Sequence, residues 1–391
     1  MTRDLLLVSI SLFTWGVGEG MYFYFQPLYL EKLGATPFII GAILSANGIA
    51  MTLAQIPGGY LADRYGPRPL MWAAWIMGSI STTIMAFSGS LPMFVAGYLL
   101  YGLTSSVLAP MNSYITRVRG TWPVQRALTF HSAMFHLGAV IGPIIGGWVG
   151  EQYSFSMVYK ISAGIFFLSS AVILCIRPVK PTPHTQVVKN GSLLQNRAFL
   201  VMLGLVFASM TVLYLPLSLT PNFLQNQIGL DLRAIGYLGS IGSLGNAVFA
   251  LVLGSLHPST GFIIGQTFVA LAALLFRVGK VIPAFAGGYF FFGGYRLSRS
   301  MVLALTRDLV HPSEIGLAYG FIETANALSV ILAPFLAGIL YEWNPVAMYS
   351  YGLLAITAVL LVSVLSLPRL LRSHAARQRS GLSLEEESHA H

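Results

Sequence analysis

Ionisable side chains within apolar stretches are the residues of this chain best placed to do chemistry. Glu19, Arg296 and Arg299 all lie inside segments that are otherwise apolar. At the centre of a bilayer such a charge costs about 2.5–3.5 kcal/mol, so it usually faces a water-filled cavity and pairs with another group. The helical face of Glu19 would also carry Trp15, Tyr22, Phe23 and Gln26. A carboxylate in that aromatic pocket could bind and release a proton, or it could be a structural carboxylate bonded to a partner.

The two arginines need anions, because guanidinium groups do not deprotonate in proteins. Glu323 is one candidate partner for Arg296 and Arg299, and it could also take part in proton coupling. Two cations against one acid would leave a positive charge that could attract an anionic group of a ligand. The alternative is that one or both arginines reach toward water or pair with Glu323 alone.

Two histidines, His131 and His136, lie in a further apolar stretch. Five residues correspond to about 140° of rotation on a helix, so the two rings would not share a face and would make a poor metal pair. One of them could point toward Glu19 and join proton coupling. A structural hydrogen bond to a neighbouring helix is an equally good interpretation. We expect no metal and no cofactor, and the lack of HExxH, Gly-x-Ser-x-Gly and Walker motifs argues against an enzyme.

Further candidates for ligand contact are polar or aromatic residues of the same apolar stretches: Tyr22, Gln26, Tyr98, Asn112, Tyr214, Asn222 and Phe292. Each of these residues also has a purely structural interpretation. Intramembrane polar residues commonly form interhelical hydrogen bonds worth about 0.6 kcal/mol. Aromatic runs commonly face lipid or the membrane interface.

The elements that must position these residues are membrane-spanning helices. The chain is 55% hydrophobic and 9% charged, and a bilayer span needs about 20 apolar residues. Its single cysteine, Cys175, excludes an intramolecular disulfide. We expect twelve spans, near residues 5–30, 36–61, 69–88, 92–115, 127–149, 157–176, 198–225, 232–256, 261–279, 283–305, 315–340 and 347–367.

Lys and Arg residues gather on one side of the expected membrane. If both termini are cytoplasmic, most of the 22 Lys and Arg residues fall on the cytoplasmic side. This positive-inside bias predicts a multi-pass protein of the plasma (inner) membrane with both termini in the cytoplasm. The formal net charge of +9 would then face anionic lipid headgroups. No nucleic-acid partner is expected.

The spans divide into two sets of six. We expect an N-terminal half at 1–176, a cytoplasmic linker at 177–197, a C-terminal half at 198–367 and a disordered cytoplasmic tail at 368–391. The linker contains three prolines and is the longest interval between spans.

The loop between the second and third spans reads Gly59-Tyr-Leu-Ala-Asp63-Arg64-Tyr-Gly66-Pro-Arg68. It resembles the signature loop of the major facilitator superfamily of secondary transporters, and the resemblance extends over residues 5–367. The matching loop of the second half, Gly254 to Pro258, lacks the Asp-Arg pair. The resemblance implies a gating role in which Asp63 faces the N-terminus of the eleventh helix, near Ile315, where the helix dipole would stabilise it.

A second motif lies in the fifth span and reads Gly138-Ala-Val-Ile-Gly142-Pro143-Ile-Ile-Gly146-Gly147. It is similar to the core of the superfamily's antiporter motif, although Thr129 stands where the longer pattern has a further glycine. The resemblance implies proton-linked efflux, and close helix packing is the alternative. Tyr98 stands where the superfamily places an arginine in the fourth span, so that arginine's proton-relay role does not transfer.

These observations predict an all-α membrane protein with twelve transmembrane helices, in the major facilitator fold of two six-helix halves. The expected function is alternating-access transport, in the form of proton-coupled export of a small amphipathic organic compound. The alternatives are proton-coupled uptake of an organic anion or sugar, and lipid or glycolipid translocation. The expected partners are a small-molecule substrate, protons and membrane lipids, and the expected state is a monomer.

Overall fold

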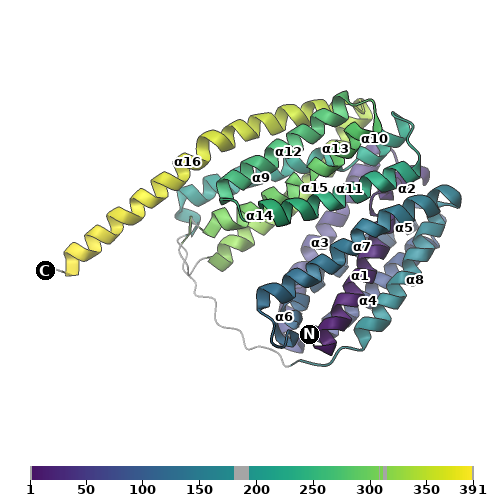
Figure 1. Cartoon of the computed structure of the whole chain (residues 1–391), viewed down its shortest axis with the longest axis horizontal. Helices are drawn as coiled ribbons and strands as arrows, with labels where there is room; N and C mark the ends of the chain where they lie inside the picture. Colours follow the sequence, from purple (N-terminus) through teal and green to yellow (C-terminus); the bar gives the residue numbers. More distant parts are fainter. Residues whose placement is uncertain (1, 180–192, 308, 311–314, 390–391) are drawn as a thin grey trace.

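The computed structural model describes residues 2–179, 193–307, 309–310 and 315–389. Within these ranges it leaves undescribed the side chains at positions 56, 59, 63, 125, 194, 316, 369 and 371–389. All regular elements of this part of the chain are helices. They form two bundles, which Figure 1 shows as a purple-to-teal N-terminal half and a green-to-yellow C-terminal half.

The helices of the N-terminal half are α1 (Arg3–Phe23), α2 (Gln26–Lys32), α3 (Pro37–Tyr65), α4 (Pro67–Ala86), α5 (Leu91–Gly102), the 3₁₀ helix η1 (Leu103–Val107), α6 (Leu108–Val118), α7 (Val124–Gln152) and α8 (Phe155–Leu174). Those of the C-terminal half are η2 (Leu193–Gln195), α9 (Arg197–Tyr214), η3 (Leu215–Leu217), α10 (Thr220–Asn226), α11 (Leu232–Leu253), α12 (Pro258–Val278), α13 (Ile282–Phe292), α14 (Gly294–Arg307), α15 (Ile315–Trp343) and α16 (Ala347–His389).

Among the described residues, eleven helical segments are long and apolar enough to cross a membrane. The predicted tenth span, 283–305, differs because it is broken into α13 and α14 at Gly293. A Cβ at this glycine would lie 2.7 Å from the backbone carbon of Gly245, so the lack of a side chain lets α11 approach closely. The predicted all-helical membrane fold is confirmed, with the tenth span as two short helices.

Corresponding spans of the two halves are interrupted in the same way. The first span comprises α1 and α2, and the seventh comprises α9, η3 and α10. The fourth span contains η1 between α5 and α6, and the tenth has the break at Gly293. Non-helical backbone at membrane depth is tolerated where it is covered by protein or lines a water-filled cavity. These four spans are therefore the ones expected to lie in the protein interior or beside a water-filled cavity.

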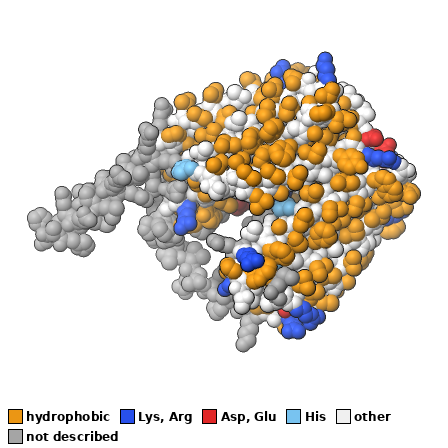
Figure 2. Space-filling view, in the orientation of Figure 1, with side chains coloured by type: hydrophobic (Ala, Val, Ile, Leu, Met, Phe, Trp, Pro, Cys, Tyr) orange, Lys and Arg blue, Asp and Glu red, His pale blue; other side chains and the backbone are white. Residues whose placement is uncertain are grey.

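The two halves meet at one end of the molecule, which we call the closed end. It contains α2, α10 and the first turns of α3 and α11. The helix pairs that join the halves are α3 with α15, α7 with α11, and α2 with α10. Toward the opposite end, where α1 begins and α6 and α14 finish, the bundles diverge (Figure 1). Figure 2 shows a hollow between them on this side, the open end.

The tail after residue 368 was expected to be disordered, and the structure instead continues α16 through it to His389. Figure 1 shows this segment projecting away from both bundles. Ala, Arg, Gln, Leu and Glu, which are good helix formers, make up most of this stretch.

Candidate functional site: a polar cavity between the two halves

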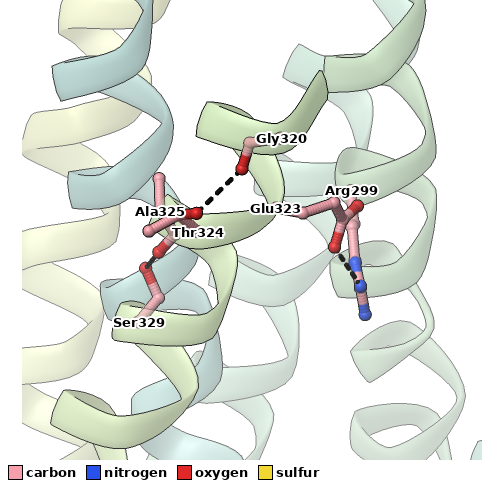
Figure 3. Close-up of polar contacts among 6 residues, drawn as sticks. All are labelled: Arg299, Gly320, Glu323, Thr324, Ala325 and Ser329. Carbon is pink, nitrogen blue, oxygen red and sulfur yellow. Dashed lines mark hydrogen bonds and ion pairs between the residues drawn. The ribbon is translucent and has the colours of Figure 1, made fainter. Parts of the chain in front are cut away.

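Arg299 of α14 and Glu323 of α15 form an ion pair within the C-terminal half. The distance from Arg299 Nη2 to Glu323 Oε2 is 2.6 Å, and the two side chains are 45% and 40% exposed. Figure 3 shows them pointing toward one another, while Thr324 bonds back to the carbonyl of Gly320 in its own helix. The positive charge of Arg299 is therefore largely balanced by Glu323.

Arg296, one turn earlier on α14, is exposed and differs from Arg299 in its surroundings. Among the residues that the structure describes, no carboxylate lies within ion-pair distance of it. Its charge interacts at longer range with Glu19 and His136 of the N-terminal half and with Tyr214 of its own half. Because these partners come from both bundles, Arg296 faces the space between the halves.

Glu19 of α1 lies on the opposite wall of this space and is half-buried. Its carboxylate lies beside Tyr101 and Trp15. Trp15 Nε1 also donates to the Tyr101 hydroxyl at 3.1 Å. The ring of Trp15 packs edge-on against Phe166, with centroids 4.3 Å apart. Packing and this hydrogen bond therefore fix the indole that lies beside the carboxylate.

The two histidines lie in different surroundings. His131 is 2% exposed. Its Nδ1 is 2.6 Å from the Ala127 carbonyl oxygen and its Nε2 is 3.2 Å from that of Leu5, so it joins α7 to α1. His136 is half-buried and close enough to Arg296 for their charges to interact. The structure thus brings His136, and not His131, toward the cavity.

Tyr98 and Tyr214 approach one another from the two halves. Tyr98 is buried and lies close to Asn47, Tyr214 and Glu19. Tyr214 lies beside Tyr295, with ring centroids 5.2 Å apart. These two tyrosines therefore line the same space as Glu19 and Arg296.

Other residues expected to contact a ligand pack within one half. Tyr22 is 1% exposed and stacks on Tyr159 at 4.9 Å between centroids. Phe292 stacks on Phe276 at 5.1 Å. Asn112 is exposed on α6.

Two more of these residues lie toward the closed end. Gln26 is buried, and its amide nitrogen has no hydrogen-bond partner among the described residues. Asn222 donates through Nδ2 to the Glu31 carboxylate, which links α10 to α2, and its Oδ1 has no hydrogen-bond partner among the described residues.

The signature segment, expected as a loop, is mostly helical, because α3 continues to Tyr65 and Gly66 alone connects it to α4. Gly66 adopts φ 83°, a left-handed conformation that favours glycine, and α4 begins directly after it at Pro67. The Arg68 guanidinium lies 3.9 Å from the Trp72 ring centroid, and Arg64 is exposed. The surroundings of Gly59 and the side chain of Asp63 lie outside the described part, so the contact expected for Asp63 stays a prediction.

The glycines of the second motif face two helices. Those at 138, 142 and 146 lie against α1, where a Cβ at Gly146 would collide with the Met21 carbonyl oxygen. Gly147 instead lies against α11, and the Pro143 carbonyl oxygen meets Gly236 of the same helix. The backbone of α7 therefore packs directly against the backbone of α1 in its own half and of α11 in the other half.

Sequence reasoning missed two groups of residues. Tyr24 interacts with Arg296 and lies 3.3 Å, hydroxyl to hydroxyl, from Ser243 of the other half. The carboxylates of Glu31, Glu151 and Glu342 all accept hydrogen bonds across the closed end. A signal for the last two was available, because the spacing Pro-x₃-Gly-x₃-Glu occurs once in each half.

Two helical bundles around a polar cavity that opens at one end define a multi-pass membrane transporter. The sequence model of the Major Facilitator Superfamily matches residues 8–261 and 202–387. The chain belongs to this superfamily, as the signature loop predicted.

Individual relatives agree with this assignment. The quinolone resistance protein NorA of Staphylococcus aureus (strain MSSA476) is 21% identical over 359 residues, covering 88% of this chain and 91% of NorA. An uncharacterised MFS-type transporter of Methanocaldococcus jannaschii is 27% identical over 174 residues, covering 44% of this chain and 45% of its own. The crystal structure of the nucleoside transporter NupG superposes with a TM-score of 0.79 at 16% identity, covering 94% of this chain and 99% of NupG.

Proposed function

We propose that this transporter exports a small amphipathic organic compound in exchange for protons. The observation that carries the proposal is the placement of Glu19 and Arg296 on opposite walls of one cavity, one from each half. The open end would face the cytoplasm, in agreement with the positive-inside bias. The chain would work as a monomer in the plasma membrane.

Glu19 is the group in this cavity suited to carry the proton. Its carboxylate touches Tyr101 and Trp15 of its own half and attracts Arg296 of the other half. Protonation would remove that attraction and deprotonation would restore it. One proton would therefore change the electrostatic energy between the two halves, which is the requirement for coupling it to their relative motion.

Arg296 is suited to bind the substrate. Glu323 balances Arg299, whereas no described carboxylate pairs with Arg296, so its charge is available to an anionic group. The aromatic rings of Trp15, Tyr98, Tyr101 and Tyr214 would contact the apolar part of the same molecule. An aromatic carboxylate fits this combination, and the likeness to a protein named for quinolone resistance supports the choice.

The test is driven transport by the Glu19→Gln variant in proteoliposomes. With a fluorescent quinolone as the probe, we expect transport driven by a pH gradient to fall at least tenfold, because the amide cannot release a proton. Gradient-independent exchange of the quinolone should persist. Asp4→Asn is the matched control, since that carboxylate lies on the same helix but accepts from the Arg177 backbone N–H.

Driven transport at the wild-type rate in Glu19→Gln would contradict the assignment. Uptake along the proton gradient, rather than countertransport, would instead favour the alternative of proton-coupled import.

A further inference from the structure

The closed end contains two contacts built on the same spacing of residues. Helix α7 carries Pro143, Gly147 and Glu151, and helix α15 carries Pro334, Gly338 and Glu342. Each triplet has the pattern Pro-x₃-Gly-x₃-Glu, which places its members on one face of the helix. Each triplet faces the first turns of a helix from the other half. We call these two contacts the α7–α11 clasp and the α15–α3 clasp.

In the α7–α11 clasp, two glycines bring the backbones together. The Pro143 carbonyl oxygen meets Gly236, and a Cβ at Gly147 would lie 2.5 Å from the Leu232 carbonyl oxygen. One turn beyond Gly147, Glu151 Oε2 accepts a hydrogen bond from the Leu232 backbone N–H at 3.0 Å. Leu232 is the first residue of α11, so the carboxylate binds an N–H that has no partner within its own helix.

The α15–α3 clasp repeats this geometry with the halves exchanged. The Pro334 carbonyl oxygen meets Gly41, and a Cβ at Gly338 would lie 2.7 Å from the Pro37 carbonyl oxygen. One turn beyond Gly338, Glu342 Oε2 accepts from the Phe38 backbone N–H at 2.9 Å. Phe38 lies in the first turn of α3. Each clasp thus consists of two glycine contacts and one carboxylate at a helix N-terminus.

These contacts join the halves rather than stabilise one of them. Both bonds run from a carboxylate of one half to a backbone N–H of the other, and the helix dipole favours negative charge there. Both carboxylates must lose their partner when the closed end opens. We propose that Glu151 and Glu342 are gating residues that hold the closed end shut and set how often it opens. This inference goes beyond the proposed function, because it requires no particular substrate or coupling ion.

The experiment measures how often the closed end opens from the reactivity of one cysteine. Cys175→Ser gives a cysteine-free chain, because no other cysteine is present. Ser240→Cys then places a thiol in the α7–α11 contact, where the Ser240 hydroxyl donates to the Val140 carbonyl oxygen at 2.7 Å. Intact cells are treated with a membrane-impermeant methanethiosulfonate. The modification rate is proportional to the open fraction even when that fraction is small.

We expect Glu151→Ala and Glu342→Ala each to raise the modification rate about threefold, and the double variant about tenfold. Glutamine at either position keeps an acceptor oxygen without the charge, so its effect should be smaller. The matched control is Asp231→Ala. Asp231 caps the same helix α11, but its carboxylate accepts from the Ala234 N–H within its own half. Asp231→Ala should leave the modification rate near that of the parent protein, which carries only Cys175→Ser and Ser240→Cys.

A double variant that reacts at the parent's rate would overturn the proposal, as would an Asp231→Ala variant that reacts as fast as the double variant. Phe87→Cys, at an exposed position between α4 and α5, establishes that the reagent reaches this face of the protein. The measurement uses neither substrate nor proton gradient. Failure of the gating proposal is therefore distinguishable from failure of the proposed proton-coupled export.

Discussion

At the scale of single residues, the two arginines of α14 have the same side chain but different surroundings. Arg299 is 2.6 Å from Glu323, whereas Arg296 has only longer-range interactions across the cavity among the described residues. Arg296 is exposed, and no described carboxylate lies within ion-pair distance of it, so its charge would be available to a ligand of opposite charge. Arg296 is therefore the position at which anion recognition should be most sensitive to substitution.

Arg296→Ala should weaken binding of an aromatic carboxylate at least tenfold, because a hydrogen bond to a charged group contributes about 1.5–3 kcal/mol. Its effect on the neutral methyl ester of the same compound should be small. Arg296→Lys keeps the charge, so its affinity for the carboxylate should lie between that of the wild type and that of Arg296→Ala. The measurement is ligand-induced thermal stabilisation of the purified protein. Equal losses for acid and ester would mean that Arg296 acts through packing or folding and not through charge.

Sequence predicted some of these residues because charge inside an apolar stretch is conspicuous. Glu19, Arg296 and Glu323 were found in this way. Asn222 was expected to contact substrate, yet its amide bonds to Glu31 of the other half. No periodicity within one segment reveals a partner that lies 191 positions away in the chain. The same limit applies to Tyr24 and Ser243, whose hydroxyls meet only because the two halves fold together.

At the scale of the helical elements, glycine spacing determines which pairs of helices touch. Gly142 and Gly146 lie on a strip of α7 that meets backbone atoms of α1, and Gly147 lies on a neighbouring strip that meets α11. Without side chains, helices can approach closely enough for van der Waals packing to hold them in lipid. The resemblance to the antiporter motif and the packing interpretation are thus compatible at this helix.

Gly146→Ala should destabilise the N-terminal half, because the added Cβ would collide with the Met21 carbonyl oxygen. Overpacking of this kind typically costs about 1–3 kcal/mol. The readout is the midpoint of thermal unfolding in detergent. Gly164→Ala on α8 is the matched control, since a Cβ there meets no atom within 4 Å. An unchanged midpoint for Gly146→Ala would show that α1 and α7 can separate without loss of stability.

Hydropathy predicted the membrane-spanning helices well but not their interruptions. Length and apolar character are local properties, and eleven of the expected spans are helical segments of sufficient length in the described chain. The break at Gly293 was not predictable, because apolar residues continue on its N-terminal side and glycine is common within membrane helices. At the break, Gly293 lies against the backbone of α11, a tertiary contact that the sequence of one segment does not reveal.

At the scale of the whole molecule, the structure shows one conformation. In it the two halves are in contact at the closed end and separated at the open end. In the proposed alternating-access cycle, the opposite conformation would form new contacts where α3 ends and α15 begins. Asp63 is expected to provide one of them, at the N-terminus of α15 near Ile315.

Asp63→Asn should therefore slow transport about two- to fivefold, the range expected from loss of one charge–dipole interaction. Protein abundance should remain near wild type, because the present conformation is held together at the other end. The measurement is initial transport rate per molecule of protein in the membrane. A wild-type rate would remove Asp63 from the gating mechanism.

The hollow at the open end also has an electrical consequence. Water in a wide vestibule conducts, so the membrane voltage falls mainly across the sealed part of the protein between the clasps and Glu19. Moving one elementary charge through 100 mV corresponds to about 2.3 kcal/mol. In this conformation a proton leaving Glu19 for the vestibule would cross little of that voltage. The membrane potential would therefore act on the arrival of the proton from the far side, and on the rearrangement of the halves, more than on its release.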